Sequence, residues 1–134
     1  MNREILFHAK RIDNGEWVTG FLVAKNDPVL EINYCFILAQ GRGDSFVNWH
    51  KVDPATVGQY TGLTDKNSKR IFEGDICRIR NLLYKVEFKY SAWNFTILSN
   101  KVYCYPAFSS HCGEYCEIIG NIHDNPELLK GGEG

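Results

Sequence analysis

The sequence lacks a long apolar run, a long stretch of helical periodicity and an excess of charge of one sign. Residues 1–10 contain no apolar core of signal-peptide length, and no segment approaches the ~20 apolar residues that a membrane helix needs. Fifteen basic against sixteen acidic residues give a net charge of −1, which argues against a general nucleic-acid binder because affinity for phosphates depends on Lys and Arg. We expect a soluble, cytoplasmic protein. Five cysteines are an odd count in that compartment, so we expect reduced thiols.

Aromatic residues, in contrast, are abundant: eight Phe, seven Tyr and three Trp make up 13% of the chain. Flat, stiff side chains at this density are typical of pleated strands and interaction surfaces rather than of helices. At 134 residues the chain fits one domain, or two very small units that share a core. A chain of this length buries about two-thirds of its unfolded surface, so its stability requires neither disulfides nor a metal.

Short alternating segments predict strands in the first half of the chain. The turn sequence Asp13-Asn14-Gly15-Glu16 suits a tight hairpin, because Asn and Gly accept positive φ, and it makes residues 1–23 a predicted hairpin. Residues 29–39 alternate, with Cys35 and Ile37 between aromatic positions, which indicates a strand with both faces partly buried. Residues 46–52 are a further strand candidate. Asp53 followed by Pro54 predicts a helical turn near residues 53–57 with Asp53 as its N-cap.

The second half alternates more regularly, with apolar side chains on one face and charged side chains on the other, as in half-buried antiparallel strands. Asn81-Leu82 is short enough to connect the first two strands. Asn125 and Pro126 predict a capped helical turn near 125–130, and residues 131–134 a disordered tail. The predicted strands of this half are 75–80, 83–90, 93–97, 101–105 and 116–122, with a loop over 107–113.

These patterns predict a mainly β fold with short helical turns. An N-terminal β-rich unit over residues 1–57 would pack on a small SH3-like barrel over residues 58–130, and the two could also form one continuous domain. Residues 58–75 contain three glycines and a polar run from Thr64 to Arg70. This composition indicates a turn and a joint between the halves rather than a reactive site.

Three stretches of the chain carry ordered motifs. The central one reads Gly58-Gln59-Tyr60-Thr61-Gly62-Leu63, then Asp65-Lys66-Asn67, then Ile71-Phe72-Glu73-Gly74-Asp75-Ile76. The last reads Ile118-Ile119-Gly120-Asn121-Ile122, then Asn125-Pro126-Glu127-Leu128-Leu129, and the first runs from Arg3 to Ala9 and from Asp13 to Gly20. Together these motifs resemble the YopX family over nearly the whole chain.

The resemblance implies a β-rich fold and a phage- or prophage-related protein in the cytoplasm of a bacterial host cell, because the family is found mainly in phages and prophages. It implies no assigned activity, cofactor or catalytic residue. Two positions depart from the family's pattern: Ser68 stands where Gly is usual, and Cys77 where a β-branched residue is commoner. Ser68 predicts either a turn with negative φ or some strain. Cys77 predicts a small hydrophobe in a buried slot.

Cys104, His111, Cys112 and Cys116 form the sharpest cluster of potential metal ligands. The spacing C-x6-H-C-x3-C lacks the C-x2-C knuckle of a zinc site, and the adjacent His111 and Cys112 can hardly both bind one metal. We therefore interpret them as ordinary loop and core residues and predict no metal. A nucleophilic pair of Cys104 with His50 or His111 would need a spatial adjacency that the sequence does not establish.

Glu73 and Asp75 flank a glycine and would suit acid–base chemistry if one of them had a raised pKa. The simpler interpretation is that both form turns, with side chains that accept hydrogen bonds from backbone N–H groups. Gly41-Arg42-Gly43-Asp44 resembles the start of a dinucleotide loop but lacks the third glycine and the following helix, so it predicts a surface loop. We predict no catalytic residue, no cofactor and no small-molecule ligand.

Basic and aromatic residues of the second half form the candidate binding surface. They follow the polar faces of neighbouring predicted strands, as in small barrels that hold single-stranded nucleic acid. Nearby Glu73, Asp75 and Glu87 weaken the positive charge. The set comprises Arg78, Arg80, Lys85, Lys89, Tyr90 and Trp93.

The expected function is that of a non-enzymatic module that binds another protein or itself, which includes a homo-oligomer, because Tyr and Trp dominate interface energetics. The alternative is a small barrel that binds single-stranded nucleic acid, and a third possibility is an enzyme with an undetected Cys or carboxylate site. An exposed flat apolar patch would favour a protein partner. A continuous positive stripe with Trp93 exposed would favour nucleic acid.

Overall fold

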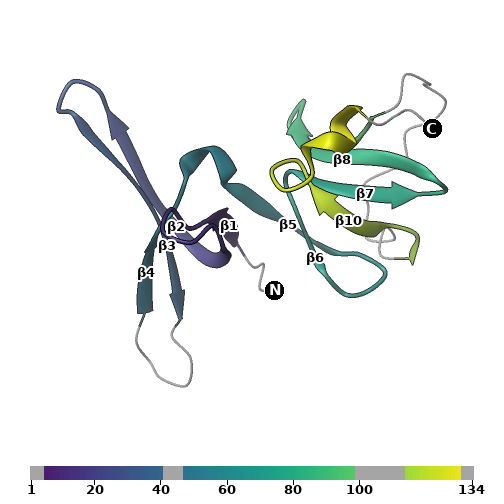
Figure 1. Cartoon of the computed structure of the whole chain (residues 1–134), viewed down its shortest axis with the longest axis horizontal. Coiled ribbons are helices and arrows are strands. Elements are labelled where there is room, and N and C mark those ends of the chain that lie inside the picture. Colours follow the sequence, from purple (N-terminus) through teal and green to yellow (C-terminus); the bar gives the residue numbers. More distant parts are fainter. Residues whose placement is uncertain (1–4, 41–46, 99–113, 131–134) are drawn as a thin grey trace. The chain divides into compact units, whose positions relative to one another are not determined.

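The computed structural model describes residues 5–40, 47–98 and 114–130 and confirms the mainly β fold (Figure 1). The chain divides into two compact units, Met1–Tyr60 and Thr61–Gly134. Strand β5 (Gly58–Thr64) continues from the first unit into the second, so this boundary falls inside β5, whereas the boundary expected from the sequence falls just before it. In the described part of the chain, no helix is long and apolar enough to cross a membrane.

The first unit is an antiparallel sheet in the strand order β4-β3-β2-β1-β5. The predicted hairpin is present, with Gly15 at φ 72° in its turn, but its second strand continues to Asp27. The predicted helical turn is confirmed, since Asp53 Oδ1 accepts a hydrogen bond from Ala55 N at 3.0 Å. The elements are β1 (Phe7–Lys10), β2 (Trp17–Asp27), β3 (Ile32–Gln40), β4 (Val47–Lys51) and the 3-10 turn η1 (Pro54–Thr56).

Strand β2 changes its partner at Gly20. Residues 17–20 pair with β1, and residues 21–27 pair with β3. Gly20 is buried, and a Cβ atom at this position would overlap the backbone carbonyl of Leu38. Only a residue without a side chain permits this close approach of two strands.

The core of the first unit lies on one face of its sheet. The other face of β3 carries the exposed Tyr34 and the half-buried Phe36 and Leu38, so this face is partly buried, as predicted, whereas the face of Cys35 and Ile37 is buried in the core. The reason is that one antiparallel sheet needs only one covered face. The buried residues are Ala9, Cys35, Ile37 and Val52, with Phe7, Val18, Leu22 and Val57 packed against them.

The second unit contains a four-stranded antiparallel sheet in the order β10-β7-β8-β9, and β6 lies beside β5. The SH3-like barrel is not confirmed, because the described strands form an open sheet with β10 and β9 at its edges. The predicted strand 101–105, the loop 107–113 and the tail 131–134 lie outside the described residues. The elements are β6 (Arg70–Phe72), β7 (Asp75–Ile79), β8 (Leu82–Lys89), β9 (Ala92–Ile97), β10 (Glu117–Asn121) and the 3-10 turn η3 (Pro126–Lys130).

Two-residue turns connect the strands β7, β8 and β9. Arg80 and Asn81 have φ values of 51° and 69°, and Tyr90 and Ser91 have φ values of 55° and 61°. Two successive positive φ values are the geometry of hairpin turns that match the twist of the flanking strands. The predicted connection Asn81-Leu82 is therefore wrong by one residue: Leu82 already pairs with Ile79.

The core of the second unit confirms the interpretation of Cys77 as a small buried hydrophobe, with 0% of its surface exposed. The buried core comprises Ile71, Cys77, Ile79, Tyr84, Val86, Phe95 and Cys116.

The helical turn η3 is present, but Asn125 does not act as its predicted side-chain cap. Asn125 Oδ1 instead accepts a hydrogen bond from Asn121 N at 3.2 Å and occupies the space beside Gly120.

The carboxylate of Asp65 holds the segment of residues 65–69 together. This side chain is only 3% exposed. Its Oδ1 atom accepts hydrogen bonds from Asn67 N at 2.8 Å and Lys69 N at 2.9 Å. Its Oδ2 atom accepts one from Ile118 N at 2.9 Å, which ties the segment to β10. Because this buried carboxylate accepts three backbone hydrogen bonds, we assign it a structural role.

Ser68 lies in this segment with φ of 64°, so the predicted negative φ is wrong and the predicted strain is confirmed. The physical reason is the tight reversal of the chain around Asp65. Ser68 N donates a hydrogen bond to the Asp65 carbonyl oxygen at 3.0 Å, and Asp65 N donates one to the Lys69 carbonyl oxygen at 2.8 Å. These bonds require the left-handed conformation at residue 68, which favours glycine.

Replacing Ser68 with glycine is therefore expected to stabilise the protein by about 1 kcal/mol. A left-handed φ costs an L-residue roughly 1–2 kcal/mol, and the greater freedom of glycine in the unfolded chain offsets part of the gain. Urea unfolding followed by circular dichroism measures the difference. Ser68→Ala is the matched control, because alanine keeps the Cβ atom and should not stabilise. An S68G variant no more stable than S68A would contradict the strain.

Candidate functional site

The basic strand residues of the predicted binding surface are paired with carboxylates. Lys85 Nζ lies 2.5 Å from Glu87 Oε1, and Lys89 Nζ lies 3.4 Å from Glu87 Oε2. Arg78 Nη1 lies 3.7 Å from Glu117 Oε1. Burial tends to raise the pKa of Glu87, but hydrogen bonds, chiefly from Lys85, outweigh it and the pKa is lowered. The carboxylates thus neutralise much of the positive charge on this side of the sheet.

The other members of the predicted surface lie apart from one another. Arg80 and Tyr90 occupy the turns at opposite ends of β8, whose eight residues span roughly 26 Å. Tyr90 is 90% exposed, and Lys89 Nζ lies 5.8 Å from the centre of its ring. Trp93 packs on the core side, with its ring 5.1 Å from that of Phe88. The six residues do not share one surface, and their role in binding stays a prediction.

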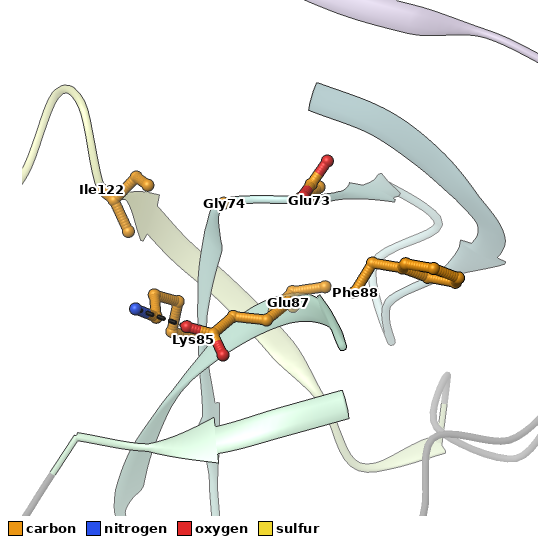
Figure 2. A pocket seen from close by; sticks show the side chains of 7 residues that line it. Glu73, Gly74, Lys85, Glu87, Phe88 and Ile122 are labelled. Carbon is orange, nitrogen blue, oxygen red and sulfur yellow. Dashed lines mark ion pairs between the residues drawn. The ribbon is translucent and has the colours of Figure 1, made fainter. Parts of the chain in front are cut away.

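A pocket of about 310 Å³ opens beside the turn between β6 and β7 (Figure 2). The ion pair of Lys85 and Glu87 lies along it. Because the pKa of Glu87 is lowered, its carboxylate is ionised near neutral pH and does not suit a general acid there. The lining residues are Glu73, Gly74, Lys85, Val86, Glu87, Phe88 and Ile122.

Asp75 is the buried carboxyl group of the same turn. It is 6% exposed, and burial raises its pKa to about 7, although the hydrogen bond from Phe72 N to its Oδ2 atom at 2.8 Å acts in the opposite direction. Glu73, its neighbour across Gly74, is exposed. Asp75 thus serves the backbone, as expected of a turn-forming carboxylate, and does not form a buried pair with Glu73.

The raised pKa of Asp75 makes stability depend on pH. Because the carboxyl group holds its proton more tightly in the folded state, its contribution is fully present below about pH 4 and is lost as the pH rises through about 7. At about 1.4 kcal/mol per pKa unit, the loss reaches at most about 4 kcal/mol. We expect Asp75→Asn to flatten the fall in unfolding free energy between about pH 4 and pH 7, as measured by urea unfolding at each pH. Parallel curves for D75N and the natural sequence would contradict this role.

The free thiols of Cys77 and Cys116 are neighbours in the core and are hydrogen-bonded to each other. Both are 0% exposed, and the hydrogen bond to Cys116, together with burial, raises the pKa of the Cys77 thiol. A buried thiol with a raised pKa is a poor nucleophile. Of the cysteine–histidine cluster, Cys116 alone is described, and Cys104, His111 and Cys112 lie outside the described residues. The described residues contain no group of three or more His, Cys, Asp or Glu that could hold a metal ion.

Sequence reasoning missed a second surface, on the side of the first unit opposite its core. The pairing register places alternate residues of β1 to β4 on this side. Phe21 and Trp49 lie on either side of Leu38, and Val23 lies opposite Phe36. We call this surface the outer face; it comprises His8, Lys10, Trp17, Thr19, Phe21, Val23, Lys25, Asp27, Ile32, Tyr34, Phe36, Leu38, Trp49 and Lys51.

Three aromatic rings of the outer face are exposed, and two of them, Tyr34 and Trp49, contact the half-buried ring of Phe36. Phe21 is 64% exposed, Trp49 59% and Tyr34 37%. The ring centres of Phe36 and Trp49 are 5.7 Å apart in an edge-to-face arrangement, and those of Tyr34 and Phe36 are 6.2 Å apart. Exposed apolar side chains gathered on one face make the outer face a candidate interaction surface.

Lysines accompany the rings of the outer face. Lys25 lies opposite Tyr34, and Lys51 lies opposite Phe36. Both lysines are exposed, and neither forms an ion pair with another residue in the described ranges. A hollow of about 300 Å³ adjoins Trp49 at the edge strand β4, and it is lined by Arg11, Ile12, Asp13, Trp49, His50 and Lys51.

The signal that could have found the outer face is present in the sequence. The alternation of Tyr34, Phe36 and Leu38 was interpreted as burial of both faces of one strand. The rings and lysines of this face occupy alternate positions along each strand: odd-numbered positions on β2 and β4, and even-numbered positions, with rings only, on β3. Parity within one strand does not tell which face is covered, and only the register between strands does so.

The fold defines the protein as one of two small antiparallel β units joined through strand β5. Within that class, the family model described as YopX protein matches residues 7–130, and the chain belongs to the YopX family. A search of curated proteins finds no match. The crystal structure of protein EF1440 from Enterococcus faecalis is similar, with a TM-score of 0.59 and 24% identity, over 96% of this chain and 99% of that chain. This likeness supports the fold.

Proposed function

We propose that this YopX-family protein is a non-enzymatic module that binds another macromolecule through the outer face of its first unit. The observation that carries the proposal is the exposure of Phe21 at 64% and Trp49 at 59% on one flat sheet face. Trp and other aromatic residues supply much of the binding energy of macromolecular interfaces. An exposed aromatic side chain on a strand whose other face already forms the core has no role in the stability of that core.

The chemistry of the second unit supports a function without catalysis. Its strongly perturbed groups serve the fold: Asp75 binds a backbone N–H group, and Cys77 is hydrogen-bonded to Cys116 inside the core. The carboxylate of Glu87 is held by two lysines. None of these arrangements presents an activated nucleophile or a general base to a substrate.

The sequence predicts a protein partner or a second copy of the chain, with single-stranded nucleic acid as the alternative, and the exposed rings of the outer face can contact either class of partner. Pairing of two outer faces is less favourable, because it would bring Lys25 and Lys51 of one copy toward the same lysines of the other. A phage-related origin and a bacterial cytoplasmic setting remain expectations that rest on the family resemblance.

Site-specific photocrosslinking tests the proposal. A benzophenone amino acid at position 21 or 49, introduced into the full chain in bacterial cells, is expected to give a light-dependent adduct. The same amino acid at position 90 is the matched control, because Tyr90 is an aromatic residue outside the outer face and, at 90%, is even more exposed. Adducts from position 90 alone, or from no position, would contradict the proposal. An adduct of twice the chain mass would identify a second copy as the partner.

A further inference from the structure

We infer that the occupant of the outer face is a single-stranded nucleic acid, whose bases stack on the exposed rings and whose phosphates lie against Lys25 and Lys51. The inference rests on the proposed function and names the partner of the same surface. The sequence suggested a nucleic-acid-binding surface on the second unit, whereas this inference places it on the first.

The rings provide a stacking platform. Phe21 on β2, Tyr34 and Phe36 on β3 and Trp49 on β4 lie on one face of an antiparallel sheet. Open sheets that expose aromatic residues bind single strands in this way, because the π-face of every base can stack on a ring whatever the sequence. A duplex does not offer its bases to such a platform.

The positions of the lysines complete the platform. Tyr34 and Phe36 lie on the central strand β3, between Lys25 on β2 and Lys51 on β4. Because neighbouring strands are about 4.8 Å apart, the two lysine-bearing strands are about 10 Å apart with the rings between them. Cations that flank a row of rings match a strand whose bases lie on the rings and whose phosphates lie at the sides.

The availability of these charges distinguishes the lysines of the outer face from those of strand β8. Lys85 and Lys89 of the second unit share the carboxylate of Glu87, so their positive charge is largely compensated. Lys25 and Lys51 have no such partner among the residues that the structure describes. Counterion release on binding requires cations that are not already neutralised. The positive charge available for binding is therefore local: it comes from these two lysines on a face that also carries Asp27, while residues 1–60 as a whole contain six basic and seven acidic residues.

The hollow beside Trp49 adds a place for a base at the edge of the platform. It measures about 300 Å³ and is lined by Trp49 and Lys51 together with Arg11. Arg11 is held by Asp13 through two hydrogen bonds of 2.9 and 2.6 Å, so the uncompensated positive charge at the hollow comes from Lys51. A base unstacked from its neighbours would lie next to the Trp49 ring with its phosphate near Lys51.

The test is fluorescence anisotropy of a labelled oligothymidine of about 20 nucleotides with the full chain. We expect binding at about 50 mM salt that weakens as salt rises, with a slope of log K against log salt near −1.4, or about −0.7 for each of two phosphates. Trp49→Ala is expected to weaken binding at least about fivefold. The double variant Lys25→Gln, Lys51→Gln is expected to bring the slope close to zero.

Tyr90→Ala and Lys89→Gln are the matched controls, because they remove a similar exposed ring and lysine from the second unit. Both should leave binding unchanged, and circular dichroism of each variant checks folding. The inference is overturned by absence of binding at low salt, by equal affinity for a duplex of the same length, or by loss of binding in Y90A with W49A unaffected. If binding is absent but positions 21 and 49 crosslink to a protein, the proposed function stands and the inference about its partner fails.

Discussion

Replacement of Asp65 with alanine is expected to destabilise the second unit by at least about 3 kcal/mol. The variant removes the acceptor of three backbone N–H groups, those of Asn67, Lys69 and Ile118. A buried donor left without a partner costs about 1–3 kcal/mol, and the side chain that would otherwise exclude water is also lost. The strained conformation at Ser68 then loses the side-chain hydrogen bonds on either side of it, and only its backbone hydrogen bonds remain.

Hydrogen exchange measured by mass spectrometry locates the effect of D65A. Peptides that contain residues 65–69 and strand β10 should lose protection together, because one carboxylate joins them. Asp27→Ala is the matched control: its Oδ1 atom also accepts hydrogen bonds from two backbone N–H groups, Val29 and Leu30, but at an exposed turn where water can replace it. If D65A costs no more than D27A, Asp65 does not have the structural role assigned to it.

Replacement of Gly20 with alanine is expected to cost at least about 3 kcal/mol in the first unit. The added Cβ atom would overlap the carbonyl of Leu38, and a backbone atom in a sheet cannot move away as a flexible side chain can. Overpacking of this kind usually costs about 1–3 kcal/mol, and the loss of strand pairing adds to it. Pairing of Phe21 with Leu38 should be the first to fail, with increased exchange in β2 and β3.

Gly15→Ala separates this clash from ordinary glycine effects. Gly15 has φ of 72°, but nothing lies within 4 Å of a Cβ built there. Its replacement should therefore cost only the strain of positive φ, roughly 1–2 kcal/mol. Thermal unfolding of both variants gives the comparison. A G20A variant as stable as G15A would show that strands β2 and β3 can separate at Gly20 without loss.

The strands that could be predicted are those with strict alternation and clear turn residues. Strands β7 and β8 match the expected segments because both alternate regularly, although Ile76 is buried on the same face of β7 as the exposed Arg78, and Phe88 is exposed on the apolar face of β8. Strands β5 and β6 were missed because Gly58 and Gly62 lower strand propensity, and because a polar run separates the two. Tertiary pairing overrides local propensity there: β5 is paired with β1, and Thr61 Oγ1 donates a hydrogen bond to the Ile71 carbonyl oxygen at 2.8 Å.

The candidate site was harder to predict than the fold. The sequence placed Arg78, Lys85 and Lys89 on a polar face, but pairing of lysines with Glu87 depends on which strand residues are neighbours in space. The outer face could be recognised only from the register of β2 with β3 and of β3 with β4. That register is defined only in the folded sheet. The structural role of Asp65 could not be predicted from the sequence either, because one of its three hydrogen-bond donors is 53 residues away along the chain.

That separation between Asp65 and Ile118 has a consequence for synthesis on the ribosome. The carboxylate of Asp65 emerges 53 residues before the N–H group that completes its hydrogen bonds. At about 5–20 residues per second, the turn waits roughly 3–10 s for β10. The second unit therefore cannot close until β10 has left the exit tunnel, whereas β1 to β4 pair among themselves earlier. The growing chain presents a finished first unit while the second is still being made.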